Sequence, residues 1–132
     1  MKRSLIFMLM LCAIILSSGL LIATGKAPAS KTQSATVIFN QPVKLLNVVL
    51  KKGEYLIVHD DAAMTRGEDC TSVYRLKTNG RELVATFHCT PVPRDMVKSF
   101  TVRTVLPTPG AMEEFREFQF AGSTESHLVP TK

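Results

Sequence analysis

Apolar and polar residues alternate along much of the chain after residue 35, which is the pattern of β-strands that bury one face. The alternation is clearest over residues 54–59 and 98–106, and Pro, Gly and Asn residues separate successive runs. The expected strands cover residues 35–39, 43–50, 54–59, 70–78, 81–89, 98–106, 114–120 and 126–129. About seven or eight short strands, with turn signals roughly every 8–12 residues, predict an all-β domain, either a single small antiparallel sandwich or a barrel.

Residues 112–120 allow two interpretations. Phe115 and the neighbouring acidic residues fit one helical turn, whereas Phe118 and Phe120 alternate as residues of a strand do. We expect a strand over 114–120 because the surrounding segments are β. The three phenylalanines are then expected to pack in the core.

Two segments interrupt the strands. Residues 60–69 are mostly polar and predict a loop. Pro91 and Pro93 predict that the strand ending at Cys89 cannot continue, because proline has no backbone N–H to donate.

Asn79-Gly80 is a strong turn signal, since a type I′ turn needs φ > 0 at both central residues. A two-residue loop at this point would pair Thr78 with Arg81. Continued outward, this register pairs Leu76 with Leu83, Tyr74 with Ala85, Ser72 with Phe87 and Cys70 with Cys89, and it sets Lys77 opposite Glu82. The first four pairs share one mostly apolar face, which is therefore expected to face the core.

Cys70 and Cys89 are consequently predicted to form a disulfide. As a hydrogen-bonded pair their Cα atoms would lie about 5.5 Å apart, which is within the range that a disulfide spans. The alternative is two buried thiols that merely touch. A disulfide at this place would cross-link the two strands of the hairpin and would require an oxidising compartment.

The N-terminus independently predicts such a compartment. Lys2 and Arg3 precede an apolar stretch over residues 5–23, and small and polar residues follow, as in a secretory signal peptide. The Ala-Pro-Ala run that ends at Ala29 fits a cleavage site before Ser30, and cleavage after Gly25 is a second option. We therefore expect a signal peptide over 1–29 and an exported β-domain over 30–132, periplasmic or extracellular. The alternative is an uncleaved membrane anchor over residues 5–23.

Removal of the signal peptide changes the charge of the protein. The whole chain has 16 Lys and Arg residues against 11 Asp and Glu, a net charge of +5. Lys2, Arg3 and Lys26 would leave, so 13 basic residues would face the same 11 acidic ones, a net charge of +2. No basic cluster interleaved with aromatic residues remains, and we expect no nucleic-acid partner.

The three histidines are the first candidates for metal binding, because imidazole suits Zn²⁺ and related ions. His59, His88 and His127 have no close spacing such as H-x-H or H-E-x-x-H. We therefore expect all three to be surface or rim histidines, with no metal and no cofactor.

The acidic residues between positions 60 and 69 are candidates for Ca²⁺, which prefers oxygen ligands. They lack the alternating order of a calcium loop, and Arg66 lies among them, so a solvated loop is expected. The acidic candidates in this segment are Asp60, Asp61, Glu68 and Asp69.

Catalytic patterns are absent from the sequence. It contains no G-x-S-x-G nucleophile elbow, and the 19 positions that separate Cys70 from Cys89 do not fit the C-x-x-C motif of thiol oxidoreductases. We therefore expect no catalytic residues and a protein that is not an enzyme.

Phe39–Val43 reads F-N-Q-P-V and Val49–Tyr55 reads V-L-K-K-G-E-Y. This pattern resembles the opening F-x-x-P-V … V-L-P-A-G-x-Y of a family of small, uncharacterised secreted bacterial proteins, although Lys51-Lys52 here replaces Pro-Ala. The resemblance continues weakly to Val129-Pro130 and implies an all-β secreted domain. It implies no activity, and the cysteine pair is not expected of every member.

The sequence thus predicts a non-enzymatic exported β-domain, a structural or interaction module of the cell envelope. Its partner would be an unidentified protein or envelope component. The alternative is a periplasmic protein that binds a small ligand or a metal.

Overall fold

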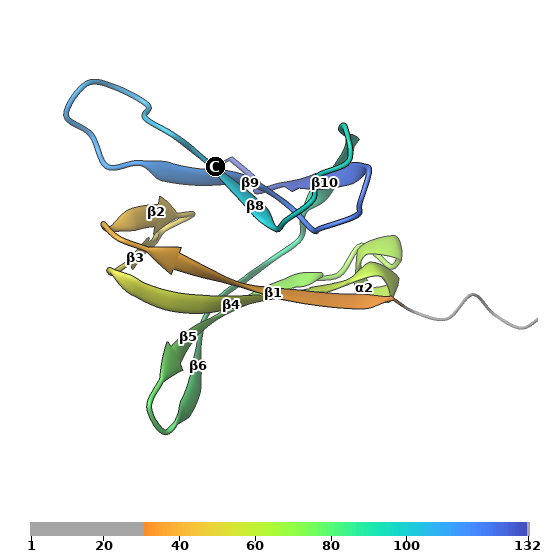
Figure 1. Cartoon of the computed structure of the whole chain (residues 1–132), viewed down its shortest axis with the longest axis horizontal. Helices are drawn as coiled ribbons and strands as arrows, with labels where there is room; N and C mark the ends of the chain where they lie inside the picture. Colours follow the sequence, from red (N-terminus) through yellow and green to blue (C-terminus); the bar gives the residue numbers. More distant parts are fainter. Residues whose placement is uncertain (1–30, 132) are drawn as a thin grey trace, which may run out of the picture.

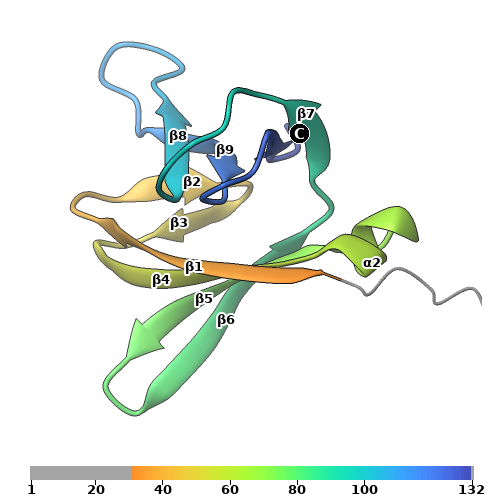
Figure 2. The ribbon, with the colours of Figure 1, turned by 45° about the vertical axis from the view of Figure 1, so that its right-hand side comes forward.

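The computed structural model describes residues 31–131, which form two β-sheets lying one over the other (Figures 1 and 2). The elements are β1 (Thr32–Phe39), β2 (Val43–Leu45), β3 (Val48–Leu50), β4 (Gly53–Asp60), α2 (Asp61–Thr65), β5 (Thr71–Lys77), β6 (Gly80–Phe87), β7 (Thr90–Pro93), β8 (Thr101–Val105), β9 (Glu114–Gln119) and β10 (Glu125–Leu128). The predicted signal peptide or anchor over 1–29 and its cleavage before Ser30 lie outside the described residues. Within residues 31–131, no helix has the length and apolar character needed to cross a membrane.

The two sheets remain separate, so the described part of the chain is sandwich-like, and the barrel alternative is wrong. One sheet has the order β1-β4-β5-β6 and is antiparallel throughout. The other has the order β3-β2-β9-β10-β7, with β8 also paired to β9. Its β2–β9 pair is parallel, which the expectation of a purely antiparallel fold did not include.

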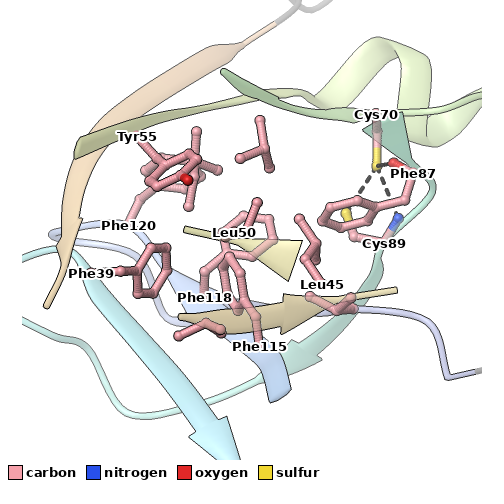
Figure 3. Packing of buried hydrophobic residues seen from close by; sticks show 14 of the residues in the cluster. Phe39, Leu45, Leu50, Tyr55, Cys70, Phe87, Cys89, Phe115, Phe118 and Phe120 are labelled. Carbon is pink, nitrogen blue, oxygen red and sulfur yellow. Dashed lines mark hydrogen bonds between the residues drawn. The ribbon is translucent and has the colours of Figure 1, made fainter. Parts of the chain in front are cut away.

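The interior between the sheets is filled mainly by aromatic and aliphatic side chains (Figure 3). β9 confirms the predicted strand, and Phe115, Phe118 and Phe120 lie in the core as expected. Phe118 is at the centre of this packing, with the centroids of six phenylalanine and histidine rings within 6.4 Å of its own.

The register predicted for the 70–89 hairpin is wrong. Lys77 pairs with Gly80, and a bulge after Val73 shifts the ladder so that Val73 pairs with Ala85 and Thr71 with Phe87. The face that contains Thr71 and Val73 is therefore buried, whereas Leu83 is 53% exposed.

The turn itself explains this difference. Gly80 has φ +130°, but among residues 31–131 the only non-glycine residue with positive φ is Leu46, so Asn79 lacks the φ that a type I′ turn needs. With Lys77 paired to Gly80, the two loop residues are Thr78 and Asn79, and neither has a positive φ. Lys77 and Glu82 still form the predicted ion pair.

Three other segments differ from expectation. The run 43–50 divides into β2 and β3 around Leu46, whose φ of 54° makes a tight turn. The expected loop 60–69 contains α2, because the Asp60 carboxylate accepts hydrogen bonds from the amides of Ala62 and Ala63 at 2.9 and 3.3 Å. Pro91 and Pro93 lie within β7, which is an edge strand where proline is tolerated.

Candidate metal centre

His59, Cys89 and His127 meet in the interior between the two sheets. His59 lies near the end of β4, Cys89 in the link from β6 to β7, and His127 in β10. Their exposed fractions are 0%, 0% and 1%. One donor atom from each residue lies within 4.8 Å of the other two. The fold thus assembles one sulfur and two nitrogen ligands from segments far apart in the sequence.

Local structure explains how each side chain reaches this place. In β4 the side chains of Tyr55, Ile57 and His59 alternate into the core. In β10, His127 pairs with Phe118 of β9, and the two rings stack with centroids 5.1 Å apart. Cys89 lies in the link between β6 of the first sheet and β7 of the second.

The two sulfur–nitrogen distances suit a tetrahedral metal ion. With bonds of about 2.3 Å to sulfur and about 2.0 Å to nitrogen, a tetrahedral centre places its sulfur and nitrogen ligands about 3.5 Å apart. Cys89 Sγ lies 3.6 Å from His59 Nδ1 and 3.6 Å from His127 Nδ1. Both sulfur–nitrogen edges of such a site are therefore already formed.

Cys70 adds a second sulfur beside this cluster. Its Sγ lies 2.9 Å from Cys89 Sγ, and Figure 3 shows the two side chains pointing toward each other. Two thiolates on one tetrahedral ion would be about 3.8 Å apart, and a disulfide bond is about 2.05 Å long. Both residues are free thiols in the structure, so the predicted disulfide is not formed there and stays a prediction.

Burial sets the protonation state of the donors. Two causes together lower the pKa of His127 to about 4. Burial is the larger cause, and the nearby His59 is the smaller one. Burial also lowers the pKa of His59, although Asp61 opposes the change. Both imidazoles are therefore neutral near pH 7, and each has one nitrogen lone pair for an acceptor role or a metal.

Burial, together with the hydrogen bond to Cys70, raises the pKa of Cys89 to about 12. Without a metal, Cys89 is thus a neutral thiol near pH 7. A metal ion must displace its proton, so binding to this cluster releases protons and strengthens as the pH rises.

Two further residues border the cluster. His59 Nε2 faces the carboxylate of Asp61 at 3.0 Å without hydrogen-bond alignment, and within residues 31–131 it has no hydrogen-bond partner. A carboxylate on the far side of a ligating imidazole is a common means of orienting that imidazole. Met64 of α2 brings its thioether sulfur to 3.9 Å from Cys89 Sγ.

The predicted site residues have mixed outcomes. The surface or rim position expected for His59 and His127 is wrong, because both are buried. His88 is exposed as expected, with Nδ1 2.7 Å from the carbonyl oxygen of Glu68. The alternation of Tyr55 and Ile57 continues to His59 and was a signal for its burial, whereas His127 required knowledge of the β9–β10 pairing.

The acidic residues of 60–69 do not converge on one point. Asp60 caps α2, Glu68 pairs with Arg66, and Asp69 accepts a hydrogen bond from Thr86 at 3.0 Å. Each of these three carboxylates has a local hydrogen-bond partner, and Asp61 lies 3.0 Å from His59 Nε2.

No protein-family model, curated protein or solved structure matches this chain. The function must therefore be inferred from the side chains that the fold brings together.

Proposed function

We propose that this chain is a non-enzymatic, exported β-domain that holds a transition-metal ion between its two sheets. Cys89, His59 and His127 are the proposed ligands. The observation that carries the proposal is the convergence of one thiol and two imidazoles, almost fully buried, with both sulfur–nitrogen separations at 3.6 Å. Export rests on the N-terminal sequence pattern.

The hydrogen bonds of the cluster favour a metal over a purely structural role. Cys89 has a single thiol proton, but His59 Nδ1, His127 Nδ1 and Cys70 Sγ all lie within 3.6 Å of its sulfur. One proton satisfies one acceptor at a time; His59 Nδ1 also lies 3.3 Å from Thr71 Oγ1, so it is His127 Nδ1 and Cys70 Sγ that compete for the Cys89 proton. A cation at the centre would engage the thiolate and both imidazoles together.

The donor set indicates the class of metal. Thiolate and imidazole ligands suit Zn²⁺ and copper, and not Mg²⁺ or Ca²⁺, which prefer oxygen. One thiolate neutralises a monovalent cation, and the nearby Asp61 carboxylate offsets part of the second charge of a divalent one. The almost complete burial of the three ligands shields a bound ion from solvent.

The test is titration of the reduced protein with Co²⁺, whose visible absorption reports tetrahedral thiolate coordination, followed by displacement with Zn²⁺. We expect saturation at one ion per chain. Cys89→Ser and His127→Gln should abolish it or weaken it by at least about tenfold, since each removes a ligand.

His88→Gln is the matched control, because it removes an exposed imidazole next to Cys89 in the sequence and should leave binding unchanged. Absence of saturable binding by the reduced protein would refute the proposal. Equal binding by wild-type, Cys89→Ser and His127→Gln proteins would place the ion elsewhere.

A further inference from the structure

Cys89 has two alternative partners for its sulfur. On one side lie the Nδ1 atoms of His59 and His127, each at 3.6 Å. On the other lies Cys70 Sγ at 2.9 Å. The Cys89 amide also donates to Cys70 Sγ at 3.2 Å, and the Cys70 amide donates to the Phe87 carbonyl at 3.1 Å. The backbone thus holds the two thiols against each other, and Figure 3 shows them pointing toward one another.

We propose that Cys70 is a redox partner of Cys89, and that the disulfide-bonded and metal-bound states of this protein exclude each other. The inference rests on the proposed metal site. A thiolate carries the negative charge that binds the ion, and a disulfide sulfur does not. Oxidation therefore removes Cys89 from the ligand set and leaves two neutral imidazoles, which bind metal far more weakly.

The position of Cys70 supports this role over that of a fourth ligand. As a ligand it would have to move away from Cys89, because the sulfur–sulfur edge of a tetrahedral site is about 3.8 Å and the observed separation is 2.9 Å. To form a disulfide it moves closer by about 0.9 Å. The observed sulfur–sulfur distance of 2.9 Å thus lies between the distance in a disulfide and the distance between two thiolates on one ion.

The oxidant in this step is an external disulfide, RSSR, of the kind present in oxidising compartments. The Cys70 thiolate attacks RSSR, forms a mixed disulfide and releases one RS⁻. The Cys89 thiolate then attacks the Cys70 sulfur, closes the Cys70–Cys89 bond and releases the second RS⁻. The two protein thiols lose two protons, which the two RS⁻ accept, and two electrons pass to the external disulfide.

Metal binding and oxidation are therefore linked. A metal that binds only the reduced protein shifts the thiol–disulfide equilibrium by the factor 1 + [M]/Kd. At a free metal concentration about one hundred times Kd, the value of [RSSR]/[RSH]² needed for half oxidation should rise about a hundredfold, because each RSSR yields two RSH.

The experiment uses purified wild-type protein, Zn²⁺ as the metal and oxidised glutathione as the external disulfide. Peptide mapping after alkylation reports the state of Cys70 and Cys89, and a chelator competition reports Zn²⁺ binding. We expect reduced protein to bind Zn²⁺, oxidised protein to lose that binding by at least about a hundredfold, and reductant to restore it.

Cys70→Ser is the matched variant, because it removes the redox partner and keeps all three ligands. It should bind Zn²⁺ equally before and after exposure to oxidised glutathione, with Cys89 unmodified in the peptide map. If this variant does not fold, the wild-type redox titration with and without Zn²⁺ still decides, through the expected hundredfold shift.

The outcomes separate the two proposals. Failure of the reduced wild-type protein to bind Zn²⁺ would overturn the metal site and this inference together. Zn²⁺ binding that is equal in the reduced and disulfide-bonded proteins would overturn the inference alone. So would two thiols that stay reduced in the metal-free protein under excess oxidised glutathione.

Discussion

Acidification should destabilise the reduced, metal-free protein through His127 well before its carboxylates become protonated. An unfolded histidine has a pKa near 6.5, whereas burial lowers the pKa of His127 to about 4 in the folded protein. Above pH 6.5 both states are neutral and the residue contributes no pH dependence. Between pH 6.5 and about 4 the unfolded chain alone takes up a proton, so stability falls as the pH falls.

The size of the effect follows from the two pKa values. Each unit of difference corresponds to about 1.4 kcal/mol, so the loss of unfolding free energy is about 2 kcal/mol at pH 5 and about 3 kcal/mol near pH 4. This is a large share of the roughly 5–15 kcal/mol that stabilises a typical domain.

The assay is urea denaturation at several pH values between 7 and 5, with EDTA and a reductant present. His127→Gln should lose about 2 kcal/mol less than the wild-type protein between pH 7 and pH 5, with a remaining slope from His59, whose pKa burial also lowers. His88→Gln should keep the wild-type slope because His88 is exposed. Comparing the wild-type, His127→Gln and His88→Gln proteins cancels the pH dependence that comes from groups present in all three. If the wild-type and His127→Gln proteins lose the same free energy between pH 7 and pH 5, the assignment to His127 is wrong.

Three further perturbations test the packing and the local structure. Phe118→Ala should cost about 3–5 kcal/mol in urea denaturation, because it empties the centre of the core, while Leu83→Ala at an exposed position should change stability by less than about 0.5 kcal/mol. Glu117→Gln should cost about 1–3 kcal/mol and lower the thermal midpoint, because it weakens the two hydrogen bonds that Arg94 donates to this buried carboxylate; an unchanged midpoint would contradict it. Asp60→Ala should cost about 1 kcal/mol and speed hydrogen exchange at the first amides of α2, and unchanged exchange would exclude the capping role.

Much of the fold could be predicted from local patterns. The strand at 114–120 and the burial of its phenylalanines follow from alternation, and so does the inward face of β4. The hairpin register could not be predicted in the same way, because it depends on one φ angle at Asn79 and one bulge after Val73. The edge position that lets β7 contain two prolines is a property of the assembled sheet.

The candidate site shows most clearly which features follow from the local sequence and which depend on the tertiary structure. The sequence determined the β class and the presence of one thiol pair and three histidines, because alternation and residue type are local properties. Only the tertiary structure decided that His59, Cys89 and His127 share one buried point and that His88 does not. That choice depends on the crossing between sheets at Cys89 and on the pairing of β10 with β9, which brings His127 beside Phe118 and over His59. Such contacts join residues far apart in the chain, and the period of two along a strand carries no information about which strands become neighbours.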